Sequence, residues 1–355
     1  MTKIYLIRHA EAEGNIYRRA HGQFNGQIIG RGYMQIEQLR KRFEHEIIDA
    51  VYSSDLDRTR VTAAAIYESH GLPLNTTDRL REVNVGVWED VAWGDIEHQD
   101  PEMSWCFGQD PARWHVNGSE DYMHVRARMT ERLIDIARKY DGGTVAVFSH
   151  GFAIRAFICG LLGVKSEDVA KVPYCDNTAV TLLVYEGGEL RLEYQSDNSH
   201  LSSEISTFAH QTWWREETEW ISENLHYMTF DEQRDFLMRQ QSGRAAGEGT
   251  DADKEYTAFL ADKPIGLVGI NTVKESKDGA GWISCIFISP DFQRKNYGIQ
   301  LLGHAISFFR KLGREKLRVE VGKDSAAFKF CRKFEFEVIG DMGAVCVLEK
   351  NIRNW

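Results

Sequence analysis

The stretch Tyr5–Ala10, Tyr-Leu-Ile-Arg-His-Ala, closes a short apolar run with an arginine and a histidine. A second stretch, Val145–Gly151, reads Val-Ala-Val-Phe-Ser-His-Gly and delivers another histidine in the same way. Both apolar runs have the length and composition of buried strands. Because ligands bind at the carboxyl ends of strands in an open α/β sheet, we expect His9 and His150 to face each other at one sheet edge.

The segments around these two stretches alternate between strand and helix patterns. Strands are predicted at 3–7, 50–53, 144–148, 178–185 and 189–195, and helices at 55–70, 122–140 and 153–162. Residues 83–117 are rich in Trp, His, Asp and Pro and show no clean period, so a long loop or cap is predicted there. The alternation indicates an α/β sandwich.

The polar residues of this region are of the types that phosphoryl transfer requires, namely a nucleophile, a cationic clamp and a proton donor. An imidazole can accept a phosphoryl group, so His9 is the candidate nucleophile. Arg8 and Arg58 are candidates for the clamp, because guanidinium forks match phosphate oxygens. Glu82 begins the irregular loop and is the candidate proton donor, and Glu89 on the same loop is the alternative.

Four motifs in this order resemble those of the histidine phosphatase (phosphoglycerate mutase-like) superfamily. They are residues 6–15 (LIRHAEAEGN), 53–63 (SSDLDRTRVTA), 80–89 (LREVNVGVWE) and 148–155 (FSHGFAIR). The resemblance covers residues 1 to about 200 and implies that His9 is phosphorylated and that Glu82 donates the proton. It implies as phosphate ligands Arg8, Asn15, Arg58 and His150. Ala10 stands where glycine is usual, and the Gly-Val-Trp-Glu form of the third motif favours hydrolysis over mutase chemistry.

After about residue 200 a second α/β pattern begins. Its most informative segment is 286–302, in which an apolar strand is followed by Pro290, a short basic loop and an apolar helix. The amide groups at a helix N-terminus bind anions. We therefore expect the amides of Arg294 to Ile299 to hold a pyrophosphate.

This segment resembles motif A of the GNAT acetyltransferase family, and residues 327–336 resemble a later motif of that family. Gln293 and Gly298 match the usual pattern, whereas Asn296 replaces a glycine; asparagine tolerates the left-handed conformation better than most residues. The resemblance covers residues 220–355 and implies acetyl-CoA as co-substrate and an amine as acceptor. The predicted cofactor-binding residues are Ile286, Ile288, Gln293, Arg294, Lys295, Asn296, Tyr297, Gly298 and Ile299. Cys331 stands where a tyrosine often serves as general acid, and the alternative is a buried small apolar residue.

The composition argues against several classes of protein. The net charge of -10 and the lack of any Lys/Arg block argue against a nucleic-acid partner. No apolar run approaches the roughly 18 residues of a membrane helix, and the N-terminal run is too short for a signal peptide. The six cysteines form no C-x-x-C pair, which indicates neither a metal site nor a disulfide framework and favours a cytoplasmic location.

A chain of 355 residues is expected to form two domains. We predict a histidine phosphatase domain at 1–200 with an α/β/α sandwich, a connecting helix at 201–222, and a GNAT-type α/β domain at 223–355. The leading hypothesis is a bifunctional enzyme: a metal-independent phosphatase for a small phosphorylated metabolite, and an acetyl-CoA-dependent N-acetyltransferase. The alternatives are an active phosphatase whose GNAT domain only senses CoA, and a mutase of the phosphoglycerate type.

Overall fold

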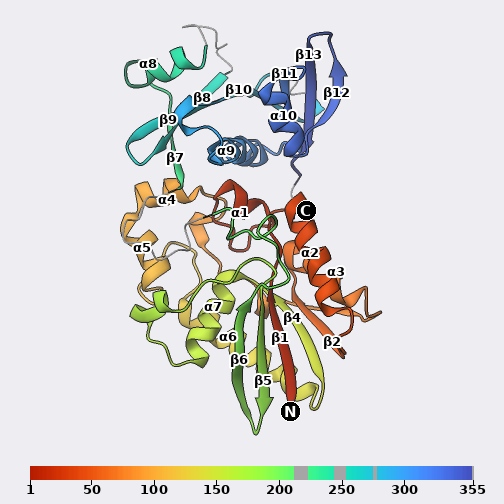
Figure 1. Cartoon of the computed structure of the whole chain (residues 1–355). Helices are drawn as coiled ribbons and strands as arrows, with labels where there is room; N and C mark the ends of the chain where they lie inside the picture. The colour runs from red at the N-terminus through yellow and green to blue at the C-terminus, as the bar shows by residue number, and fades with distance from the viewer. Residues whose placement is uncertain (212–222, 244–252, 275–277, 354–355) are drawn as a thin grey trace. The chain divides into compact units, whose positions relative to one another are not determined.

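The computed structural model describes residues 1–211, 223–243, 253–274 and 278–353 (Figure 1). The chain divides into two compact units, each with its own sheet, which confirms the predicted two-domain α/β fold class. The first unit comprises Met1–Asn15, Ala20–Val91 and Gln99–Ile221, and the second comprises Ile16–Arg19, Ala92–His98 and Ser222–Trp355. In the region of the predicted connecting helix, residues 201–211 form turns, and 212–222 lie outside the described residues.

The first unit is built on a six-stranded sheet of order β3-β2-β4-β1-β5-β6. Its strands are β1 (Thr2–Arg8), β2 (Ala50–Ser54), β3 (Leu74–Thr77), β4 (Thr144–Ser149), β5 (Val180–Glu186) and β6 (Glu189–Asp197). The four strands β1 to β4 run parallel, whereas β5 and β6 are antiparallel additions at one side. The predicted strands in this unit are therefore present, and β3 was not predicted.

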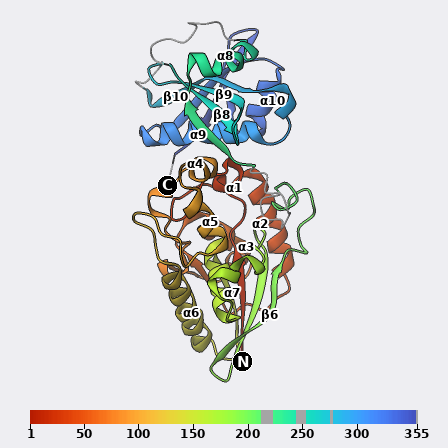
Figure 2. The same ribbon diagram turned by 90° about the vertical axis from the view of Figure 1, so that its left-hand side faces the viewer.

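Helices cover both faces of this sheet. Helices α2 (Gly30–Phe43) and α3 (Asp57–Tyr67) pack on one face, and α6 (Tyr122–Lys139) and α7 (Gly151–Leu161) lie on the other (Figures 1 and 2). The core under α2 and α3 includes Ile7, Leu39, Phe43, Ile66, Ala146 and Phe148. The short elements of this region are α1 (Glu13–Tyr17), η1 (Asp78–Leu80) and η3 (Ser166–Lys171).

The segment 83–117, predicted to be a long loop or cap, contains three short helices. It forms η2 (Gly86–Trp88), α4 (Trp93–Gln99) and α5 (Pro101–Gln109). Helices this short complete at most two or three turns, so they produce no sustained hydrophobic period. The start of α5 carried a readable signal, because the Asp100 side chain accepts a hydrogen bond from the amide of Met103 and Pro101 occupies the first turn.

The second unit contains a seven-stranded sheet of order β12-β13-β11-β10-β9-β8-β7. Its strands are β7 (Leu225–Thr229), β8 (Asp253–Leu260), β9 (Lys263–Asn271), β10 (Ala280–Ile288), β11 (Lys316–Gly322), β12 (Glu337–Asp341) and β13 (Val345–Asn351). The helical elements are α8 (Glu232–Gln241), η5 (Pro290–Phe292), α9 (Tyr297–Lys311) and α10 (Ala326–Lys333). Helix α9 packs against β9 and β10, and α10 packs against β11.

Strands β10 and β11 separate from each other along their length. They pair in parallel only over Ala280–Ile283 and Lys316–Val319, whereas β10 continues to pair with β9 as far as Ile288. The β9–β10 register shifts between Ile283 and Cys285, at the point where the two parallel strands part. A bulge changes the direction of a strand, and among the described residues no strand pairs with one edge of the second half of β10. Within the part of the chain that the structure describes, no helix is long and apolar enough to cross a membrane.

Candidate functional site

His9 and His150 meet at the carboxyl edge of the first sheet, as predicted from the sequence. Strands β1 and β4 are parallel neighbours whose register pairs Arg8 with Ser149, so the two residues that follow, His9 and His150, emerge side by side. Their ring centroids are 5.3 Å apart with planes inclined by 56°. Both side chains are buried.

A hydrogen bond fixes the tautomer of His9. Its Nδ1 lies 2.7 Å from the carbonyl oxygen of Ala10, and because a carbonyl can only accept, Nδ1 carries the hydrogen. The lone pair is therefore on Nε2. Burial lowers the pKa of His9 well below its ordinary value, and the charges of Arg58 and Arg8 lower it further. The imidazole is accordingly neutral and nucleophilic near neutral pH.

His150 has the complementary tautomer. Nε of Arg58 donates to Nδ1 of His150 at 3.2 Å, so the hydrogen of the neutral ring is on Nε2. Burial lowers the pKa of His150 well below its ordinary value, and the charge of Arg58 adds to this effect. Its Nε2 is buried and has no hydrogen-bond partner among the described residues, and the same holds for Nε of Arg8. Two buried donors of this kind require an acceptor from a ligand or water.

A hydrogen bond to the turn before β5 holds the Arg8 guanidinium. Its Nη1 donates to the carbonyl oxygen of Cys175 at 2.6 Å. A Cβ atom at position 151 would meet the Arg8 guanidinium at 3.2 Å, so Gly151 makes room for this side chain. The small residue after the second histidine therefore admits the side chain of an arginine.

Arg58 lies in the first turn of α3, and its guanidinium donates most of its hydrogen bonds to groups of the protein. Its Nη1 donates to the carbonyl oxygen of Phe24 at 2.8 Å and its Nη2 to that of Gly22 at 2.6 Å. Burial lowers the pKa of Arg58 to about 10, so the guanidinium stays charged near neutral pH. With Nε on His150, few of its hydrogens remain for a phosphate oxygen.

Glu82 binds the N-terminus of α7. Its Oε1 accepts from the amides of Val83 at 3.0 Å and Ala153 at 2.8 Å, and its Oε2 accepts from that of Phe152 at 3.0 Å. Burial raises the pKa of Glu82, although these three amides oppose the rise. Arg128 fixes the same loop by donating to the Glu82 carbonyl at 3.1 Å. A buried carboxyl with a raised pKa suits a proton donor.

Glu89, the alternative proton donor, is engaged elsewhere. Its Oε1 accepts from the amide of Gln23 at 2.7 Å and its Oε2 from that of Phe24 at 2.9 Å. Glu89 therefore holds the loop whose carbonyls bind Arg58. This geometry favours Glu82 over Glu89 as the acid.

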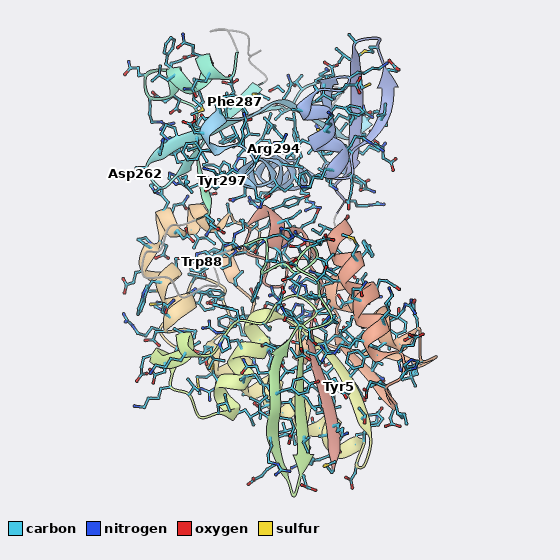
Figure 3. The ribbon with its side chains drawn as sticks, viewed as in Figure 1. Tyr5, Trp88, Asp262, Phe287, Arg294 and Tyr297 are labelled. Atoms are coloured by element: carbon cyan, nitrogen blue, oxygen red, sulfur yellow. The ribbon has the colours of Figure 1, made fainter. Side chains whose placement is uncertain are left out.

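Asn15 completes the predicted set in the first unit, and a cluster of aromatic residues adjoins it. The Oδ1 of Asn15 accepts from the amide of Ala12 at 3.0 Å, so this part of the side chain stabilises its own turn. Trp88 (labelled in Figure 3) and Trp114 are buried with ring centroids 5.6 Å apart, in a cluster that also contains Phe107 and Phe152. This cluster adjoins the site because the amide of Phe152 binds Glu82.

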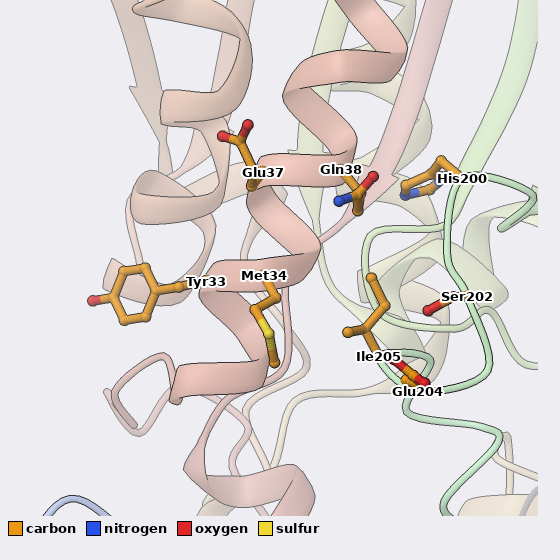
Figure 4. A pocket seen from close by; sticks show the side chains of 8 residues that line it. All are labelled: Tyr33, Met34, Glu37, Gln38, His200, Ser202, Glu204 and Ile205. Atoms are coloured by element: carbon orange, nitrogen blue, oxygen red, sulfur yellow. The ribbon is translucent and has the colours of Figure 1, made fainter.

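An open hollow of about 560 Å³ lies elsewhere in this unit, between α2 and residues 200–205 (Figure 4). It is lined by Tyr33, Met34, Glu37, Gln38, His200, Ser202, Glu204 and Ile205. None of these residues was predicted to belong to a site.

The predicted cofactor loop of the second unit contains two residues in the left-handed conformation. Arg294 and Asn296 both have a φ of 63°, in the left-handed region, and Asn296 directly precedes α9. Residues 293–296 are exposed (Arg294 and Tyr297 are labelled in Figure 3). The side chain of Gln293 donates to the carbonyl of Ile288 at 2.9 Å and so ties the loop to the end of β10. The first amides of α9 have no acceptor within the helix.

Gly298 and Cys331 are placed by packing. A Cβ at position 298 would lie 3.3 Å from the ring of Phe330, so the helix start approaches α10 closely. Cys331 is 5% exposed within the core of this unit, and burial raises the pKa of its thiol to about 11. This environment favours the alternative of a small apolar residue.

No cluster of three His, Cys, Asp or Glu side chains that could bind a metal occurs in the described ranges of the chain.

Sequence reasoning missed the turn that precedes β5. Asn177 donates from Nδ2 to the carbonyl of His9 at 2.9 Å, and Cys175 accepts from Arg8. Thr62 likewise accepts from the amide of Ala10 at 2.9 Å. No local spacing links these residues to His9, so the only available signal was the polar pair Asp176-Asn177 before a predicted strand.

Comparison with known proteins places both units in families. Residues 4–198 match the family model of the histidine phosphatase superfamily (branch 1), and residues 208–336 match that of the acetyltransferase (GNAT) family. Phosphoserine phosphatase 1 of Hydrogenobacter thermophilus is 31% identical over 186 residues, which are 52% of this chain and 88% of that protein. A probable phosphoglycerate mutase of Serratia proteamaculans is 30% identical over 166 residues, or 47% of this chain and 77% of that protein.

A solved structure agrees with these matches. YhfR of Bacillus stearothermophilus superposes with a TM-score of 0.55 at 28% identity, and the match covers 56% of this chain and 99% of that one. Similarity to each of these three proteins therefore extends over about half of this chain.

Proposed function

Because this chain belongs to the histidine phosphatase superfamily and also carries a GNAT-family domain, we propose that it hydrolyses a small phosphomonoester through a phosphohistidine on His9. The observation that carries this proposal is a pair of buried donors, Arg8 Nε and His150 Nε2, that have no acceptor in the described part of the chain. They lie beside a histidine whose Nε2 is unprotonated. These donors suit the oxygens of a phosphoryl group in transfer.

The residues divide the reaction into two balanced steps. Nε2 of His9 forms a bond to phosphorus while the bond from phosphorus to the leaving oxygen breaks, and Glu82 gives its proton to that oxygen. Water then attacks the phosphohistidine, Glu82 takes a proton from the water, and phosphate leaves with His9 restored. Arg8, Arg58, Asn15 and His150 are proposed to bind the phosphoryl oxygens.

Trapping of the intermediate tests the proposal. The protein is incubated with a substrate that carries a label in its phosphoryl group, and the reaction is stopped by denaturation in alkali. An acid-labile label should remain on the wild-type chain and none on His9→Asn. Phosphoserine is the first substrate to try, because one relative is named for its hydrolysis. Phosphate release at the wild-type rate by His9→Asn would refute the mechanism. Transfer to a second substrate molecule in the presence of a bisphosphorylated primer would identify a mutase instead.

The second domain is proposed to bind acetyl-CoA. The amides of Arg294 to Ile299 hold its pyrophosphate, and Ile286 and Ile288 lie along the rest of the acetyl-CoA molecule. The separation of β10 from β11 supports this, because it leaves one edge of β10 unpaired next to that loop. Acetyl-CoA supplies an activated acetyl group for an amine acceptor. Gln293, Lys295, Tyr297 and Gly298 shape the loop and the helix start.

Titration of the full chain with acetyl-CoA, beside an assay of free-CoA release, separates the alternatives. Binding with release in the presence of an amine supports a transferase, and binding without release supports a sensor.

All six cysteines are free thiols, which supports the proposed cytoplasmic location. The domain boundaries are proposed as 1–200 and 223–355.

A further inference from the structure

The turn Cys175–Thr178 holds the nucleophile strand end from one side. The carbonyl of Cys175 accepts from Arg8 at 2.6 Å, and the side chain of Asn177 donates to the carbonyl of His9 at 2.9 Å. The amide of Thr178 points to the same His9 carbonyl at 3.4 Å. The position of this turn therefore sets the positions of both Arg8 and His9.

The turn is in a conformation that its own sequence does not favour. Thr178 has a φ of 59° and is fully buried, although a β-branched residue rarely adopts the left-handed region. Such a residue persists only where its surroundings over-determine it. The Oγ1 of Thr178 lies 3.1 Å from Nε2 of His200, whose Nδ1 accepts from Arg42 at 3.1 Å. Because Arg42 can only donate, Nε2 is the donor to Thr178.

Asp176 ties this turn to residues 198–208, which follow β6. Its Oδ1 accepts from the amides of Asn177 at 2.8 Å and Phe208 at 3.3 Å. Its Oδ2 accepts from Nδ2 of Asn198 at 3.1 Å and from the hydroxyl of Ser206 at 2.6 Å. Asp176 is 2% exposed, and all four donors are neutral. A carboxylate is the side chain of this size that satisfies four converging donors, because both of its oxygens accept.

We infer that Asp176 is a positioning residue for the phosphoryl-transfer site, fixing the turn that holds Arg8 and His9 by clamping it to residues 198–208. The inference rests on the proposed phosphatase function. It extends the site beyond the four sequence motifs, into the segment that leads out of the phosphatase domain. Residues 200–205 border the open hollow on their α2 side (Figure 4), and Gln35 of α2 donates to the carbonyl of Ile205 at 2.8 Å. Asp176 and Thr178 therefore hold this segment together with Gln35.

The substitution Asp176→Asn tests the inference with little change of shape. The amide keeps one accepting oxygen and turns an NH₂ group toward two donors, so half of the clamp is lost. A displacement of about 1 Å in the site costs about 10²-fold in rate, and we expect a fall in kcat of that order for alkyl and aryl phosphates alike. KM should change far less than kcat. Asp168→Asn, which changes a half-buried carboxylate paired with Lys171, is the matched control and should leave both constants unchanged.

A spectroscopic readout distinguishes positioning from general loss of structure. The ¹⁵N signals of the His9 imidazole, assigned by their absence from His9→Asn, should shift in Asp176→Asn and stay in place in Asp168→Asn. If Asp176→Asn does not fold, Ser206→Ala and Ser206→Thr replace it: the first removes one donor and should lower kcat, and the second retains the hydroxyl and should restore it.

The outcomes for the inference and for the proposed function are separable. A folded Asp176→Asn variant with wild-type kcat and unshifted His9 signals would overturn the inference, as would equal activity in Ser206→Ala and the wild type. A wild-type chain that releases no phosphate from any monoester would instead remove the proposed function. The imidazole signals would then still decide whether Asp176 positions His9.

Discussion

Replacing Glu82 with glutamine should separate the proton donor from the rest of the site. The substitution retains size and one accepting oxygen but removes the acidic proton. A poor leaving group, such as an alkoxide, needs that proton in the transition state, whereas p-nitrophenolate leaves without it. We therefore expect Glu82→Gln to slow hydrolysis of alkyl phosphates about 10²- to 10⁴-fold and that of p-nitrophenyl phosphate by less than about 10-fold.

The structural cost of the same change follows from its three contacts. If the amide oxygen takes the place of Oε1, the bonds from Val83 and Ala153 survive. The NH₂ group then faces the amide of Phe152, and one buried donor loses its acceptor. This costs about 1–3 kcal/mol of folding free energy, which denaturant titration measures independently of the rate.

Glu89→Gln is the matched control, because Glu89 lies on the same loop and also accepts from backbone amides. It should lower stability by a comparable amount and slow both substrates by the same factor. Steady-state kcat/KM for phosphoserine and p-nitrophenyl phosphate would be compared across the three proteins. Equal losses on both substrates in Glu82→Gln, or leaving-group dependence in Glu89→Gln, would refute the assignment of Glu82.

Four further outcomes follow from the two sites. For alkyl phosphates, kcat/KM should fall at low pH as His9 becomes protonated, and because burial lowers the pKa of His9, this fall should lie below the ordinary histidine pKa. It should also fall at high pH as Glu82 loses its proton, above the ordinary glutamate pKa, because burial raises the pKa of Glu82. A pH–rate profile in which Glu82→Gln keeps the high-pH fall would contradict this. EDTA should leave phosphate release unchanged, and metal-dependent recovery after chelation would count against the mechanism. Gly298→Glu should abolish acetyl-CoA binding in calorimetry by placing an anion at the phosphate site. Gly298→Ala should weaken binding much less, because its Cβ would only make a close contact of 3.3 Å with the Phe330 ring. Cys331→Ala should lower the free energy of unfolding by roughly 1 kcal/mol and leave free-CoA release unchanged; slower release with unchanged binding would restore Cys331 as the general acid.

The sequence predicts the meeting of His9 and His150 because the information is local. Each histidine ends an apolar run, and parallel strands end at one edge of a sheet. Helix α2 was not predicted, because its first turn contains Gly30 and Gly32, which are typical of a break. The clamp on Asp176 was not predictable either, since its donors Asn198, Ser206 and Phe208 lie 22 to 32 residues further along the chain.

The second unit shows the same division between local and distant information. The left-handed conformation of Asn296 was expected from its residue type, and the structure confirms it. Strands β7, β8 and β12 were not predicted, because each takes its register from a neighbouring strand. The separation of β10 from β11 depends on the pairing of three strands, which no single segment encodes.

The hydrogen bond from Arg58 to His150 has a consequence for the charge balance of the site. Because Nδ1 of His150 accepts that bond, the ring binds as a neutral dipole, and His9 is neutral as well. Arg128, nearby, is balanced by Glu120 at 2.6 Å. Arg8 and Arg58 thus supply two positive charges, which match the two negative charges of a phosphomonoester dianion. A phosphodiester carries only one negative charge, so we expect the site to bind a monoester dianion in preference to a diester.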